Sequence, residues 1–128
     1  MICLKSKPLS ESSMAKLWRQ AVLIKCKHRC YLCGVYGDEN LECHHIIKRR
    51  YKSTRWYWKN GTSLCRACHS AVETKSAVRR ELENNWQYMD ELDEMNMTDY
   101  KTMLSEKGYT HDEYYNLMAD MLKRIGNG

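Results

Sequence analysis

The chain has 128 residues, of which 43% are hydrophobic and 29% charged, and it contains one proline. This length suits one domain with at most a short appendage, and the composition excludes disordered and fibrous proteins. No run of about 20 apolar residues could cross a membrane, and the first residues lack the apolar stretch of a signal peptide. We therefore expect a soluble, cytoplasmic protein without a membrane partner.

The net charge of +5 conceals an uneven distribution along the chain. Residues 1–80 carry 17 Lys and Arg against 5 Asp and Glu, a net of +12, whereas residues 81–128 carry 4 against 11, a net of −7. A basic segment favours a polyanionic partner, and an acidic segment is repelled by one. We expect a nucleic-acid-binding part followed by a part with another role.

The first two thirds of the chain contain a helix and a hairpin. Apolar residues recur at helical spacing over about residues 13–26, with Ser12 or Ser13 as the N-cap. Residues 41–47 have the pattern of a half-buried strand, and residues 62–65 form its partner after the Asn60-Gly61 turn signal. Helix-forming residues then continue from Arg66 to about residue 84, which completes a strand–strand–helix unit.

The last third is expected to be helical. A helix over residues 98–107 ends at Gly108, and Thr110 with Glu113 forms a capping box for a final helix. Its methionine-rich face suits core packing or self-association better than cofactor binding. We therefore expect an α+β, mostly helical fold with two units, residues 1–84 and an acidic helical extension over residues 85–128.

Seven cysteines, an odd number without a signal peptide, argue against a disulfide framework. Four of them form two Cys-x-x-Cys pairs, Cys30 with Cys33 and Cys65 with Cys68. Such pairs supply the four thiolates of a tetrahedral zinc site. The alternatives are two disulfides, a redox pair, haem attachment or chance, and neither the compartment nor the sequence context favours the first three. We expect a structural zinc ion.

Histidines surround the cysteine pairs in a specific order. His44-His45 and then Asn60 lie between the pairs, and His69 directly follows Cys68. Over about residues 14–84, this combination resembles the HNH endonucleases, in particular small phage and bacterial members with two Cys-x-x-Cys knuckles. The basic run before Asn60 is similar to phage recombination nucleases of that group. The resemblance implies a ββα-metal HNH core with structural zinc, preceded by a helix and followed by the helical extension.

The resemblance also implies roles for individual residues. His44 and His69 match metal ligands, His45 the general base, and Asn60 the residue that pins the loop and orients the base. Glu73 lies one helical turn after His69 and is a candidate third metal contact, although a solvated glutamate is the plainer interpretation. The divalent cation could be Mg²⁺, Mn²⁺, Ni²⁺ or Zn²⁺. Neighbouring residues of a strand face opposite sides, so we expect a bend at residues 44–45 that keeps both His44 and His45 near the phosphate.

Basic and aromatic residues alternate between residues 48 and 59. Cations supply most of the non-specific affinity for DNA and rings can wedge or stack, but a solvated loop over packed aromatics would look the same. We expect Trp56 or Trp58 to be buried, and Arg55 to act as a catalytic phosphate clamp near the scissile bond. The candidate DNA-binding residues are Lys48, Arg49, Arg50, Lys52, Arg55 and Lys59.

The resemblance implies a metal-dependent endonuclease that cuts or nicks DNA and leaves 5′-phosphate and 3′-hydroxyl ends. The alternative is a zinc-stabilised DNA-binding module without catalytic activity. We expect residues 85–128 to form a homodimer, to dock another protein, or to shield the basic face.

Overall fold

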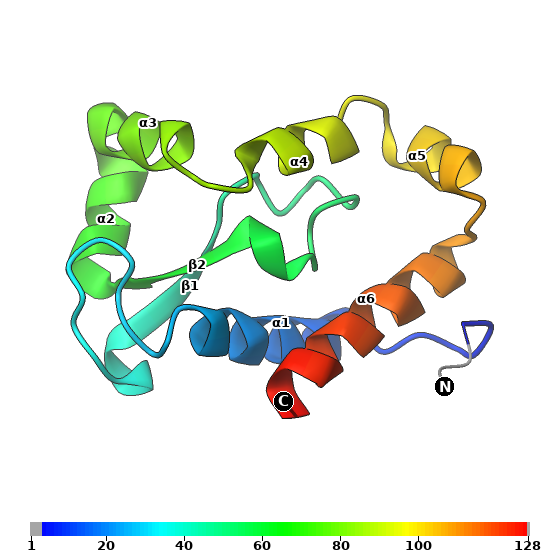
Figure 1. The fold of residues 1–128 in the computed structure, drawn as a ribbon, viewed down its shortest axis with the longest axis horizontal. Coiled ribbons are helices and arrows are strands. Elements are labelled where there is room, and N and C mark those ends of the chain that lie inside the picture. Colours follow the sequence, from blue (N-terminus) through cyan, green and yellow to red (C-terminus); the bar gives the residue numbers. More distant parts are fainter. Residues whose placement is uncertain (1–3, 128) are drawn as a thin grey trace.

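The computed structural model describes residues 4–127, which form six α-helices, two 3-10 helices (η) and one two-stranded antiparallel sheet. In chain order these are α1 (Glu11–Lys25), η1 (Asp38–Asn40), β1 (Leu41–His45), η2 (Trp58–Asn60), β2 (Gly61–Cys65), α2 (Arg66–Thr74), α3 (Ser76–Asn84), α4 (Met89–Met95), α5 (Tyr100–Lys107) and α6 (His111–Asn127) (Figure 1). The expected mainly helical α+β class is confirmed. None of these helices is long and apolar enough to span a bilayer.

Helix α1 begins two residues earlier than the sequence pattern predicts. Its N-cap is Ser10, not Ser12 or Ser13, and the Ser10 Oγ accepts a hydrogen bond from the Ser13 backbone N–H at 3.2 Å. This bond satisfies one of the free N–H groups at the helix start, and Glu11 adds a favourable negative charge in the first turn. The apolar face of α1 is buried in the core.

The hairpin pairs β1 with β2 in a register that runs from Leu41 opposite Cys65 to His45 opposite Gly61. β1 ends at His45, two residues before the expected end, because the Ile47 N–H donates to the Asn60 side chain at 2.7 Å and not to a strand. The direction of the chain therefore changes at residues 46–47, after the histidine pair. The expected bend at residues 44–45 is wrong.

The single helix expected over residues 66–84 is two helices, α2 and α3, separated at Lys75. Lys75 has an extended backbone (φ −116°, ψ 105°), and the Thr74 hydroxyl donates back to the carbonyl one turn earlier. A straight helix of that length would extend for about 28 Å. The break instead allows Leu82 of α3 to join the same core as Val72 of α2.

The ends of the last two helices follow the sequence signals. Gly108 ends α5 with a left-handed backbone (φ 76°, ψ 28°), a conformation that glycine adopts without strain. The Thr110 Oγ1 accepts from the Glu113 N–H at 3.1 Å, and the Thr110 N–H donates to the Glu113 carboxylate at 2.9 Å. The predicted capping box before α6 is thus present.

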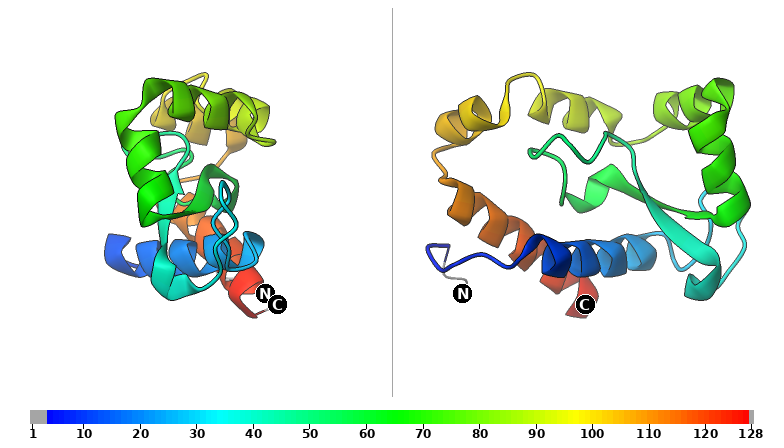
Figure 2. Two further views of the ribbon diagram at one scale, coloured as in Figure 1. Left: turned by 90° about the vertical axis from the view of Figure 1, so that its left-hand side faces the viewer. Right: turned by 180° about the vertical axis from the view of Figure 1, so that it is seen from behind.

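Both halves of the chain contribute to one hydrophobic core. Helices α1 and α6 lie along one side of the molecule, α3, α4 and α5 lie along the opposite side, and the hairpin lies between them (Figures 1 and 2). Glu11 of α1 accepts hydrogen bonds from the Trp56 indole at 2.9 Å and from the Tyr115 hydroxyl at 2.6 Å. Trp56 is the buried tryptophan of the expected pair, and Trp58 is half-buried. The packing therefore continues across the charge boundary near residue 84.

A groove of about 760 Å³ lies between α4, α5 and α6, and methionines form much of its lining. Met103 and Met118 are buried, as the packing interpretation predicts, whereas Met97 is 80% exposed. A docked partner or a second copy of the chain at this face stays a prediction.

Replacing Gly61 with alanine should destabilise the fold. A Cβ at this position would lie 2.6 Å from the Trp18 ring and would also collide with Val22, so α1 could not pack against β2 without moving. Overpacking of this kind costs about 1–3 kcal/mol of unfolding free energy, measurable by urea denaturation. Gly126→Ala in α6, where the nearest atoms lie at 3.4 Å, is the matched control and should stay within about 0.5 kcal/mol of the unchanged protein. Equal stability of the two variants would contradict this packing.

Candidate active site

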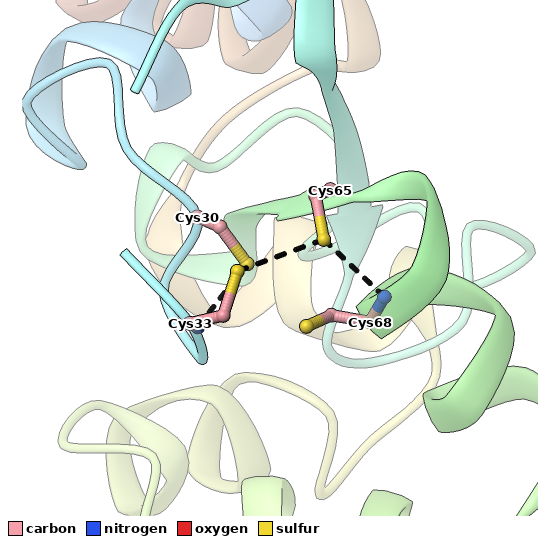
Figure 3. A group of neighbouring side chains, drawn as sticks. All are labelled: Cys30, Cys33, Cys65 and Cys68. Carbon is pink, nitrogen blue, oxygen red and sulfur yellow. Dashed lines mark hydrogen bonds between the residues drawn. The ribbon is translucent and has the colours of Figure 1, made fainter. Parts of the chain in front are cut away.

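The four cysteines of the two pairs converge from opposite sides of one point (Figure 3). Cys30 and Cys33 come from the loop after α1, Cys65 ends β2, and Cys68 lies in the first turn of α2. The four sulfur atoms all lie within 4.8 Å of one another. The sequence prediction of a four-cysteine cluster is therefore confirmed.

The geometry of this cluster fits zinc. A tetrahedron of sulfurs at the usual zinc–sulfur distance has edges of about 3.8 Å, and the Cys33 and Cys65 sulfurs lie 3.7 Å apart. The Cys30 and Cys65 sulfurs each accept a hydrogen bond from the backbone N–H three residues later, at 3.5 Å and 3.4 Å. Burial alone would raise the pKa of the Cys30 thiol, but hydrogen bonds from backbone N–H groups lower it to about 6. Without a metal ion the cluster thus favours one thiolate, at Cys30, while the neighbouring cysteines raise the pKa of Cys33 and burial with these neighbours raises that of Cys68.

The alternative of two disulfides does not describe this cluster. A disulfide requires two sulfurs about 2.05 Å apart, and the cysteines of both pairs are free thiols. The cluster could instead hold one structural metal ion such as zinc.

A second group of possible metal ligands comprises His44 on β1 and His69 and Glu73 on α2. One carboxylate oxygen of Glu73 lies 3.5 Å from His44 Nδ1 and 3.2 Å from His69 Nε2. All three ligand atoms lie within 4.8 Å of one another. Glu73 is therefore directed towards the two imidazoles, although 57% of its side chain is exposed. Two imidazoles and a carboxylate are donors that fit any of the four expected divalent cations.

Glu42, which sequence analysis did not single out, holds His69 in position. Its carboxylate lies 2.7 Å from His69 Nδ1, so Nδ1 donates to Glu42, and a metal ion bound beside Glu73 would take the lone pair of Nε2. This hydrogen bond lowers the pKa of Glu42. Carboxylates commonly orient metal-binding histidines in this way. The spacing in the sequence could have identified Glu42, because it precedes His44 by two residues and therefore lies on the same face of β1.

Burial and charge keep His44 neutral, which is the form that binds a metal ion. Burial lowers the pKa of His44 to about 4, and the neighbouring His69 ring and the Arg79 guanidinium act in the same direction. The carboxylate of Glu73 opposes this shift without reversing it.

His45 faces the other side of β1 and is held by aromatic rings. It stacks on Trp18 with ring centroids 3.9 Å apart and lies edge-on to Trp56 at 5.8 Å. His45 Nε2 lies 2.9 Å from the Arg55 carbonyl oxygen, which can only accept, so Nε2 donates and Nδ1 keeps a free lone pair. Burial lowers the pKa of His45 to about 4, although the bond to Arg55 opposes it. The ring is neutral at pH 7.

Asn60 fixes the loop that presents this carbonyl group. Its side chain is fully buried, accepts from the Ile47 N–H, and donates to the Ile47 and Thr54 carbonyls at 3.0 Å and 3.2 Å. The bonds to Ile47 therefore tie the two ends of the 46–60 loop together. The bond to Thr54 holds the loop one residue before Arg55, whose carbonyl group bonds to His45. The expected pinning of the loop by Asn60 agrees with these bonds.

The C-terminal extension holds the same loop from outside. Its side chains bond to the loop at four places, which are Trp86 to the Lys59 carbonyl, Glu91 to Tyr57 and Lys59, Asn96 to Thr54, and Tyr114 to the Ser53 carbonyl. The hydrogen bond from Tyr57 lowers the pKa of Glu91, and the Lys59 ammonium acts in the same direction. The acidic extension thus stabilises the loop that positions His45.

The six candidate DNA-binding residues divide into two groups. Four are exposed cations on the loop, namely Lys48, Arg49, Arg50 and Lys52. The other two are engaged within the protein, since Lys59 pairs with Glu91 at 2.9 Å and the Arg55 guanidinium donates to the Arg49 carbonyl at 2.7 Å. Arg55 also lies 3.5 Å from Glu11, and only 17% of its side chain is exposed. In this structure Arg55 contacts the site through its carbonyl group.

A cavity of about 320 Å³ opens beside the second ligand group. Its lining combines the histidines with basic and acidic side chains, namely Cys43, His44, His45, Ile46, Lys48, Arg49, His69, Glu73, Arg79 and Glu83. Arg79 and Glu83 belong to α3 and were not predicted as site residues. They could not be, because the break at Lys75 that brings α3 to this cavity has no strong signal in the sequence.

Comparisons with known proteins add no relative. No family model, no curated protein and no solved structure matches this chain significantly. The resemblance to HNH endonucleases therefore rests on the motif residues alone.

Purified protein should contain one tightly bound zinc ion per chain. Because the cluster joins two segments far apart in sequence, removing the ion with a chelator should lower the melting temperature. Cys65→Ser should reduce the zinc content in the same way, whereas Cys26→Ser, a free cysteine outside the cluster, should not. Mass spectrometry of metals and circular dichroism measure the two effects. A zinc-free protein with an unchanged melting temperature would contradict the zinc assignment.

Replacing Glu42 with glutamine should weaken metal binding at the second group. The amide cannot hold the protonated Nδ1 of His69 as strongly as the carboxylate does, so the affinity for Mn²⁺ should fall about 10–100-fold. Calorimetric titration of the zinc-loaded protein measures this change. Glu39→Gln, an exposed acidic residue nearby in sequence, is the control. An unchanged Mn²⁺ affinity in Glu42→Gln would show that Glu42 does not support the site.

Proposed function

We propose that this protein is a metal-dependent endonuclease of the HNH family, which hydrolyses phosphodiester bonds in DNA and leaves 5′-phosphate and 3′-hydroxyl ends. One observation carries the proposal: the ligand group of His44, His69 and Glu73 shares a cavity with His45, a neutral histidine held separately. Phosphodiester hydrolysis needs a group to take a proton from water and a positive charge to stabilise the phosphate.

Each residue of the cavity has a role in this reaction. A divalent cation on the three ligands would act as a Lewis acid on the phosphate and the departing 3′ oxygen. His45 would accept the proton of the attacking water at Nδ1, because Nε2 is committed to the Arg55 carbonyl. Glu42 would keep His69 aimed at the cation, and Asn60 would keep the loop around His45 in place.

The exposed cations on the 46–60 loop support DNA as the substrate. Lys48, Arg49, Arg50 and Lys52 are exposed, and none of them pairs with a carboxylate within residues 4–127, so their charges can contact phosphates, which dominate non-specific affinity for DNA. Such contacts position the duplex and do not read its bases. We therefore expect DNA binding with a steep salt dependence and little sequence preference. Free thiols in the cluster suit a reducing compartment such as the cytoplasm.

A zinc-stabilised DNA-binding module without catalytic activity is the rival proposal. The four-cysteine cluster and the basic loop would suit it equally well. The second ligand group favours the nuclease, because neither the zinc cluster nor DNA binding requires Glu42, His69 and Glu73 to be arranged around His44.

Supercoiled plasmid incubated with Mg²⁺, Mn²⁺, Ni²⁺ or Zn²⁺ tests the proposal. The wild-type protein should nick or cut the plasmid with at least one of these ions. His45→Ala should lose about 10²–10⁴-fold in rate through loss of the base, yet retain zinc and DNA binding. His111→Ala, which removes an exposed histidine of α6, should cleave at the wild-type rate.

Gel analysis of the plasmid and mobility shift of a labelled duplex separate the outcomes. Retarded DNA without product under any ion would support the binding module and refute the nuclease. Cleavage by His45→Ala at the wild-type rate would refute the role of His45 alone.

A further inference from the structure

Helix α3 supplies the metal cavity with a cation that is not part of the basic loop. The extended backbone at Lys75 makes α3 leave the direction of α2 (Figures 1 and 2). Arg79, in the middle of α3, consequently lines the same cavity as His44, His69 and Glu73. A continuous helix would have carried Arg79 away along its own axis.

Arg79 has no acidic partner among residues 4–127. None of the ion pairs in this part of the chain involves it, although it is half-buried. Glu83, one turn later on α3, also lines the cavity without pairing with Arg79. By contrast, Arg55 and Lys59 of the loop are both engaged by carboxylates. Arg79 is thus a guanidinium beside the ligand group that is still free to bind an anion.

We infer that Arg79 binds the non-bridging oxygens of the phosphate that is cleaved. The inference rests on the proposed nuclease function and assigns to Arg79 the contact that sequence analysis assigned to Arg55. A guanidinium offers a planar fork of N–H donors that matches two phosphate oxygens. In a partly enclosed site this charge stabilises the negative charge that develops during the reaction.

The structural alternative is that Arg79 only solvates the surface of α3 or pairs transiently with Glu83. Under that alternative, removing the side chain would change stability and leave the chemical step intact. Arg80 provides the matched control, because it has the same charge, is the next residue of α3, is exposed and does not line the cavity.

The test measures kcat and KM on a short labelled duplex with the ion that supports plasmid cleavage. Arg79→Ala should lower kcat about 10²-fold, more than it changes KM. Arg79→Lys should be intermediate, because it keeps the charge and loses the fork. Added guanidinium should restore part of the rate of Arg79→Ala and leave Arg80→Ala unaffected. Duplex binding gives a readout that is independent of cleavage. In the His45→Ala background, Arg79→Ala should make the slope of the logarithm of the binding constant against the logarithm of the salt concentration shallower by about 0.9.

Each other outcome has a distinct meaning. Wild-type kcat in Arg79→Ala would overturn the inference and leave the nuclease proposal standing. A slower Arg79→Ala with a lowered melting temperature and no guanidinium rescue would assign Arg79 a structural role and also overturn it. If the wild-type protein failed to cleave DNA with every one of the four ions, the nuclease proposal would be refuted, and the role of Arg79 with it.

Discussion

The position of α2 relative to β1 decides whether His44, His69 and Glu73 come close enough together to hold a metal ion. Cys65 ends β2 and also caps α2 by accepting the Cys68 N–H, so the four-cysteine cluster holds the start of the helix. The hairpin register then places His44 opposite Thr62, alongside the helix that carries His69 and Glu73. A metal ion in the cluster would therefore stabilise a second site that shares none of its ligands.

The other half of the site depends on a loop that the hairpin alone could not hold. Fifteen residues, 46–60, separate the strands, and an unrestrained loop of this length would not fix the Arg55 carbonyl against His45. Asn60 ties its ends from inside, and side chains of the acidic extension tie it from outside. The extension also shares the core with α1. Its acidic side chains and its packing therefore stabilise the basic part of the chain even without a separate partner.

Local signals in the sequence predicted the elements whose cause is local. The helix of α1, the hairpin, the Gly108 stop, the Thr110 capping box and the cysteine cluster all follow from spacing and propensity. Features that depend on tertiary packing were not predicted. The break at Lys75 serves the burial of Leu82, and the Arg55 side chain is drawn to Glu11 of a distant helix. Glu42 could have been found from strand alternation with His44.

Two separate groups of candidate metal ligands, one of sulfur atoms and one of nitrogen and oxygen atoms, share helix α2, and we propose that each holds an ion of its own. X-ray absorption spectroscopy of zinc-loaded protein with added Mn²⁺ tests it most directly, because each metal edge reports its own neighbours. Zinc should have four sulfur neighbours at about 2.3 Å, and manganese should have nitrogen and oxygen neighbours only. Nitrogen in the zinc shell, or sulfur in the manganese shell, would contradict the separation of the two centres.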